Sequence, residues 1–305
     1  MKKQAILIAG AILSAMILGC ENSVPIFDGT GDEITLAEDE VFTLKSAEST
    51  DRDINAARFG ANMFTGGMVV GGPHQFFGMH FPSCATVTVN GEDFPKEIII
   101  DYGDGCTGRA GLEKRGVITL HMTDTITSPG ATYTITFEDV SIGNRHLEKT
   151  ATITNAGLNS EDQWVITSQW VLTSTRESGG ETVVVIREYS ETKVWISGFE
   201  TPEIQDDIFT KSGGGTILVN DELTYERTIT DDLLLNRQCM FPLSGVIEIT
   251  RKGEAMSIDF GEGECDNIAV VTKDGESEEI ELISGRFKKE FHRKEKHMKK
   301  HNGWW

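Results

Sequence analysis

Hydrophobic and polar residues alternate along most of the chain between residues 84 and 282, a pattern typical of β-strands. Clusters of Gly, Asn and Asp separate the alternating segments at short intervals, as turns between antiparallel strands require. No helical stretch of about 10–15 residues lies between them, which excludes a Rossmann or α/β-barrel fold. We therefore predict an all-β domain over residues 81–285, in one unit or two halves, built as an antiparallel β-meander that forms a sandwich or a curled sheet. The predicted strands include 117–123, 132–137, 150–155, 182–189, 193–198, 223–230, 246–250 and 268–272.

The N-terminus carries the pattern of an export signal. Met1-Lys2-Lys3 is positively charged, and an apolar run of fourteen residues follows from Ala5 to Leu18. At about 1.5 Å per residue such a helix falls short of a ~30 Å hydrocarbon core, so we interpret residues 1–19 as a signal peptide. The run ends in Gly19-Cys20, which resembles the lipobox of bacterial lipoproteins, where a Cys after small residues is acylated and becomes the mature N-terminus. The alternative is an ordinary signal peptide with an incidental Cys.

Acylation of Cys20 predicts an outer-membrane lipoprotein that faces the periplasm or the cell surface, with the membrane as its partner. A second acyl chain, such as palmitate, makes an anchor of this kind stable. We assign residues 20–80 to a lipid-anchored tether and an apolar linker. Within them, the acidic segment 28–40 suits a solvated tether, and an apolar stripe over 50–64 predicts one short helix.

The remaining four cysteines are even in number, which in an exported chain indicates disulfides with three conceivable connectivities. An internal repeat selects among them, because residues 100–106 match residues 258–265 with one residue inserted. The repeat favours two related disulfide-stapled hairpin units that bracket a central meander, each bond worth ~3 kcal/mol. Zinc is the alternative, but no Cys-x-x-Cys and no neighbouring His supports it. The expected pairs are Cys84–Cys106 and Cys239–Cys265.

The paired Asp-(Tyr/Phe)-Gly-x-Gly-Cys blocks resemble a largely uncharacterised family of exported lipoproteins in Bacteroidota. The resemblance covers about residues 80–283 and includes Gly116-Val-Ile-Thr, Pro129-Gly130 and the segments 151–155 and 265–269. It implies an all-β fold and an outer-membrane or cell-surface setting, and it implies no biochemical role. The stretch 101–105 also resembles the loop of PKD-type immunoglobulin-like domains, although the Trp expected before that loop is absent.

Charge separates the last twenty residues from the rest of the chain. The 305 residues carry 28 Lys and Arg against 48 Asp and Glu, a net charge of −20, which disfavours a nucleic-acid partner. Residues 286–305 form a basic tail with eight Lys or Arg, two Glu and three His, a net charge of 8 − 2 = +6. With its Phe and Trp residues the tail is suited to anionic lipid, lipopolysaccharide or acidic glycan. The alternative is a tail that covers the chain's own acidic body or aids solubility.

Two acidic loops are the candidate metal sites. Clustered carboxylates on Gly-rich turns provide the oxygen ligands that Ca²⁺ prefers, so a calcium ion is the one cofactor that the sequence raises. The alternative is that each Asp caps its own turn while Gly residues adopt positive φ. The candidate residues are Asp101 and Asp104 in the first loop, and Asp259, Glu262, Glu264 and Asp266 in the second.

Catalytic signatures are missing from the sequence. It has no Gly-x-Ser-x-Gly, His-Glu-x-x-His or phosphate loop, and His121 alternates within a predicted strand as an ordinary surface or core residue does. Trp164, Trp170 and Trp195 form a sugar-stacking platform or, alternatively, fill a β-core. We therefore expect a non-catalytic binding or structural module that contacts a glycan, an envelope polymer or a protein. The alternatives are a polysaccharide hydrolase with strand-borne carboxylates and a calcium-stabilised adhesive module, so enzymatic activity is left undecided, with the balance against it.

Overall fold

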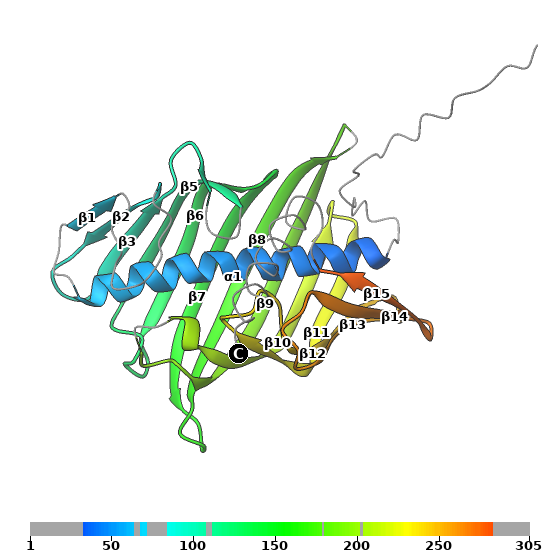
Figure 1. Ribbon diagram of the computed structural model, residues 1–305. Coiled ribbons are helices and arrows are strands. Elements are labelled where there is room, and N and C mark those ends of the chain that lie inside the picture. The colour runs from blue at the N-terminus through cyan, green and yellow to red at the C-terminus, as the bar shows by residue number, and fades with distance from the viewer. Residues whose placement is uncertain are drawn as a thin grey trace, which may run out of the picture.

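A single antiparallel sheet and one long helix make up the computed structural model (Figure 1). The structure describes residues 33–63, 68–71, 84–107, 112–178, 180–201 and 204–282, so Cys20 and the basic tail lie outside the described residues. The helix is α1 (Glu33–Met63), and a short 3₁₀ turn, η1 (Ile204–Asp206), precedes β10. The strands are β1 (Met68–Gly71), β2 (Thr86–Asn90), β3 (Lys96–Asp101), β4 (Cys106–Thr107), β5 (Glu113–Met122), β6 (Thr132–Ile142), β7 (Arg145–Leu158), β8 (Trp164–Ser178), β9 (Glu181–Ser197), β10 (Ile208–Val219), β11 (Leu223–Asn236), β12 (Ser244–Arg251), β13 (Glu254–Glu262), β14 (Ile268–Lys273) and β15 (Glu276–Glu281).

The sheet is a meander in which each strand pairs with its neighbours in the chain. The order runs from β1 to β15 without a crossover, and only β4 lies off this path, where it pairs with β5. This confirms the predicted all-β antiparallel meander. Of the two arrangements expected, the described residues form one curled sheet, and α1 lies across its inner face in the place that a second sheet would take in a sandwich (Figure 1).

Helix α1 differs from the sequence prediction in length and in environment. The sequence predicts a short helix over 50–64 after a solvated tether, whereas the structure has a helix of 31 residues that begins at Glu33. Asp39 and Glu40, expected in the tether, are only 3% and 1% exposed. The hydrophobic stripe of the helix is sparse, and its acidic residues find cations on the sheet, so the periodicity of α1 alone does not mark its full extent.

Strand β10 contains three consecutive glycines, at positions 213–215. A Cβ atom on Gly213 would lie 2.2 Å from the backbone oxygen of Ser190, and one on Gly215 would lie 1.9 Å from that of Glu188. Between Lys211 and Gly213 the register with β11 also shifts. Glycine inside a strand marks a bend or a close approach of backbones. The three glycines therefore allow β9, β10 and β11 to approach closely and bend together.

The two disulfides join the expected cysteines. Cys84 and Cys106 have a Cα–Cα distance of 5.4 Å, and Cys239 and Cys265 one of 5.6 Å. The repeat is also structural, because the hairpins β2–β3 and β12–β13 bury equivalent aromatic side chains, Tyr102 at 1% and Phe260 at 3% exposure. The predicted pair of disulfide-stapled hairpin units is therefore present at the two ends of the meander.

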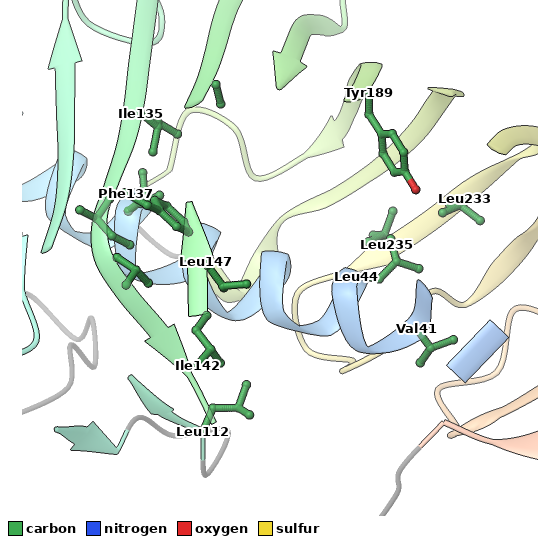
Figure 2. Packing of buried hydrophobic residues seen from close by; sticks show 14 of the residues in the cluster. Val41, Leu44, Leu112, Ile135, Phe137, Ile142, Leu147, Tyr189, Leu233 and Leu235 are labelled. Atoms are coloured by element: carbon green, nitrogen blue, oxygen red, sulfur yellow. The ribbon is translucent and has the colours of Figure 1, made fainter. Parts of the chain in front are cut away.

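Apolar side chains of the sheet gather at two places along α1. Figure 2 shows Phe137 and Leu147 of β6 and β7 near one part of the helix, and Leu233 and Leu235 of β11 near another part, beside Leu44 of α1. Most of the buried hydrophobic residues belong to the strands. The core is therefore built mainly by the sheet, and α1 lies along two of its apolar regions.

Candidate functional site: a charged interface between the helix and the sheet

Asp39 of α1 lies among three arginines from three neighbouring strands. Arg145 of β7 is 2.6 Å from one carboxylate oxygen, Arg176 of β8 is 3.7 Å from the same oxygen, and Arg187 of β9 donates to the other. All four side chains are at most 7% exposed. Burial opposes ionisation of Asp39, but the positive charges of Arg145, Arg187 and Arg176 outweigh it and hold the pKa of this carboxyl well below its usual range.

Glu40 continues this network towards β11. Arg227 of β11 donates from Nε to Glu40 over 2.8 Å, and the Tyr189 hydroxyl of β9 donates to the other carboxylate oxygen over 3.1 Å. Arg227 also donates to Glu191 over 3.2 Å, and Glu191 lies 3.0 Å from Lys211. Two carboxylates of α1 thus meet four arginines, which we call the arginine cluster: Arg145, Arg176, Arg187 and Arg227.

Further along α1, three more carboxylates each meet a cation of the sheet. The distances from carboxylate oxygen to nitrogen are 2.6–2.9 Å, and the Tyr102 hydroxyl also donates to Asp53 over 2.8 Å. The interface is therefore a series of ion pairs along the helix rather than a continuous apolar contact. The three pairs are Glu48–Arg237, Asp51–Lys193 and Asp53–Lys114.

The pKa values of the buried cations follow their partners. Burial disfavours the charge of Arg187, but Asp39, Tyr189 and Glu40 raise its pKa above the ordinary value. For Lys45 of α1 the effect of burial dominates and lowers the pKa to about 8. In the Asp39–Arg187 pair the guanidinium keeps its proton and the carboxylate stays ionised, which makes both groups poor general acids or bases.

The hydrophobic and polar pattern of the sequence does not predict this interface, although part of it is visible in β9. Arg187, Glu191 and Lys193 lie on the inward face of β9 with Tyr189, and they alternate with the outward residues of the strand. Three charged residues at a spacing of two or four on one face of a long strand are the signal that would have indicated a charged interior. This signal is hard to recognise in the sequence, because the outward positions of β9 are also polar or β-branched.

The carboxylates of the predicted acidic loops cap their own turns, although Tyr102, next to Asp101, contacts Asp53 of the interface. Asp101 accepts from the backbone N–H of Gly103 over 2.7 Å, and Asp259 accepts from that of Gly261 over 2.9 Å. Asp266 accepts from the N–H of Ile268 over 3.0 Å. Asp104, Glu262 and Glu264 are exposed, and among the described residues no group of three or more His, Cys, Asp or Glu side chains is placed to hold a metal ion. Calcium binding stays a prediction.

The predicted aromatic and histidine candidates have structural partners. Trp195 is buried and stacks on Phe209 at a centroid distance of 4.7 Å, and Trp170 donates from Nε1 to Glu191 over 3.0 Å. Trp164 is half-buried and stacks on Phe199. His121 is exposed, with Nε2 3.3 Å from a Glu97 oxygen. Trp195 thus fills the interior, and Trp164 and Trp170 are partly buried and pack against the core rather than form an open platform.

A small cavity lies between α1 and the end of β11. It has a volume of about 10 Å³ and is lined in part by Lys45, Phe209, Arg237 and Phe241. This volume accommodates about one water molecule. The cavity is therefore too small for a substrate.

Comparison with protein-family models, with characterised proteins and with solved structures finds no match to this chain. Within the described ranges, the structure also contains no helix that is both long enough and apolar enough to cross a membrane. The geometry of the charged interface, with the sequence, is therefore the basis for a functional proposal.

Proposed function

We propose that the protein is a lipid-anchored outer-membrane lipoprotein, facing the periplasm or the cell surface, that acts as a non-catalytic binding module. The observation that carries the proposal is the charged interface. The buried carboxylates Asp39, Glu40 and Glu191 all hold cations in ion pairs, and a carboxylate that is already paired supports recognition and positioning better than proton transfer.

The two disulfides support the compartment. Disulfides persist in oxidising environments such as the bacterial periplasm and the cell surface, which agrees with export through the signal at residues 1–19. Cys20 precedes the first residue of α1 by 33 − 20 = 13 positions. Acylation of Cys20 would therefore attach the membrane anchor close to the helix.

Metabolic labelling with an alkyne-bearing palmitate tests the anchor. We expect the label in the wild-type chain and its loss in Cys20→Ala, with the variant moving from the membrane fraction to the soluble fraction. Cys84→Ala, which keeps Cys20, is the matched control and should stay labelled. An unlabelled wild-type chain in a lipoprotein-processing host contradicts the proposal.

A polysaccharide-hydrolysis screen tests the non-catalytic part. We expect no turnover with envelope or environmental glycans, and retention of any bound glycan in intact form. Turnover that a single Asp or Glu substitution abolishes would replace the binding module with the hydrolase alternative.

A further inference from the structure

We propose that the inner face of the sheet is a binding groove for the phosphate group of a lipid, and that α1 fills this groove as a displaceable internal ligand. In the ligand-bound state the phosphate takes the positions of the Asp39 and Glu40 carboxylates against the arginine cluster. This inference rests on the proposed function, since a membrane anchor would keep the groove beside its ligand.

The groove is lined mainly by positively charged side chains. The chain as a whole carries a net charge of −20, yet the inner face of its sheet is cationic. Among the buried residues that the structure describes in the sheet region, only Glu191 and, beside β10, Asp207 are acidic. Such a face requires an anionic occupant, and α1 supplies it here. The cations are Lys114, Arg145, Lys149, Arg176, Arg187, Lys193, Lys211, Arg227 and Arg237.

Helix α1 leaves some hydrogen-bond donors of the arginine cluster without an acceptor. Arg187 and Arg227 are both fully buried, and Nη1 of Arg187 and Nη2 of Arg227 have no hydrogen-bond acceptor among the described residues. A phosphate group presents more acceptor oxygens than a carboxylate, and guanidinium groups pair with it in a bidentate way. Four guanidinium groups that converge from β7, β8, β9 and β11 therefore suit a phosphate better than the two carboxylates they now hold.

The contact that α1 makes with the sheet is largely polar. Between residues 39 and 58 the helix buries six polar or charged side chains and five hydrophobic ones, two of which are only Ala. Contacts that open and close are more polar than permanent ones, which resemble a domain core. The buried residues are Asp39, Glu40, Thr43, Lys45, Ser46 and Thr50, and Val41, Leu44, Ile54, Ala56 and Ala57.

The apolar regions along α1 indicate a lipid rather than a soluble phosphate. Phe137 and Leu147 lie near one part of the helix, and Leu233 and Leu235 near another part (Figure 2). With α1 displaced, these side chains would be available to acyl chains while the phosphate meets the arginine cluster. The thirteen positions from Cys20 to Glu33 span at most ~45 Å when extended, so an anchored protein remains within reach of the membrane surface.

Displacement has a thermodynamic signature. When a site is open in only a fraction of the molecules, the apparent dissociation constant is the intrinsic one divided by that fraction. A substitution that loosens α1 at its far end, without touching the arginine cluster, must therefore tighten ligand binding. A site that merely lies beside a fixed helix would not respond in this way.

The test uses the mature full-length chain with Cys20→Ser, so that its own lipid cannot compete. Dihexanoyl phosphatidic acid is titrated below its micellar concentration, with dihexanoylglycerol and inorganic phosphate as the two halves of the ligand. Calorimetry measures binding, and amide hydrogen exchange follows residues 39–58. We expect the phosphatidic acid to bind at least tenfold more tightly than either half, and the amides of α1 to exchange faster at saturation while those of β6–β9 do not.

Each other result overturns the proposal. Equal binding of inorganic phosphate would make free phosphate the ligand, and equal binding of dihexanoylglycerol would leave only an apolar site. Binding without faster exchange in α1 would show that the helix is not displaced. Absence of binding would leave the groove as a purely structural interface.

Variants separate displacement from a general loss of structure. Asp53→Asn weakens the pair with Lys114, far from the arginine cluster, and should tighten phosphatidic acid binding about tenfold. Arg187→Gln and Arg145→Gln should weaken it at least tenfold, and either one suffices if the other fails to fold. Arg115→Gln, at an exposed cation paired with Glu113, is the matched control and should leave affinity unchanged. Unchanged or weaker binding by Asp53→Asn overturns the displacement.

This experiment fails independently of the proposed function. It uses a chain without lipid, so binding is measured whether or not Cys20 is acylated in cells. An unlabelled Cys20 with a positive titration would remove the anchor and keep the groove, whereas a labelled Cys20 with a negative titration would do the reverse.

Discussion

Replacing Asp39 by Asn removes one buried negative charge and keeps the shape of the side chain. The carboxylate is 2.6 Å from Arg145 and 3.7 Å from Arg176, it accepts from Arg187, and the side chain of Asp39 is 2% exposed. Removing one partner of a buried ion pair typically costs about 3–5 kcal/mol, because the remaining charge stays desolvated without compensation. We expect Asp39→Asn to lower the free energy of unfolding by this amount at pH 7, measured by urea denaturation.

Glu113→Gln is the matched control for this prediction. Glu113 lies 2.6 Å from Arg115, the same distance as in the buried pair, but the side chains are 50% and 57% exposed. Exposed pairs contribute little, so we expect a change within about 0.5 kcal/mol. A loss below about 1 kcal/mol for Asp39→Asn, similar to the control, would refute the reasoning.

The same variant makes a prediction about pH. The pKa of Asp39 is lowered in the folded protein, so its ionisation contributes stability that is present above the unfolded-state pKa of about 4 and is lost as the pH falls below it. Asp39→Asn lacks this contribution at every pH. The difference in unfolding free energy between the two proteins should therefore shrink below pH 4, and a constant difference down to pH 2 would contradict the assignment.

The remaining predictions concern the curl of the sheet, Lys45 and the acidic loops. Gly215→Ala should lower the unfolding free energy by about 1–3 kcal/mol in urea denaturation, because its Cβ would overlap the Glu188 backbone oxygen; an unchanged midpoint would show that the strands are not so close. Burial lowers the pKa of Lys45 to about 8, so the folded state disfavours its charge and stability should rise between about pH 8 and 10.4. Lys45→Met should be more stable than wild type at pH 7 and should lack that rise, whereas a less stable Lys45→Met would contradict the argument. Since Asp101 and Asp259 accept hydrogen bonds within their own turns, calcium and excess chelator should give the same melting midpoint; a calcium-dependent rise that Asp101→Asn abolishes would assign the loops as ion sites.

The amino-acid sequence by itself determined the strands, the meander and the two disulfides. Alternation with a period of two is a local property, and strands joined by short turns pair with their neighbours in the chain. The repeat at 100–106 and 258–265 selected the disulfide pairs for the same reason, since each pair closes a short segment of 22 or 26 residues. These features depend on residues that are close in sequence.

Only the tertiary structure decided the extent and burial of α1 and the position of the arginine cluster. Asp39 and Arg187 are 148 positions apart, and Glu40 and Arg227 are 187 positions apart. Nothing local marks these residues as partners, and in an extended chain each charge is stabilised by water. The partners meet because the sheet curls around α1 (Figure 1), which removes water from the inner face and leaves a carboxylate of α1 as the stable counter-charge. A segment that the sequence indicates as a solvated tether thereby becomes part of a buried helix.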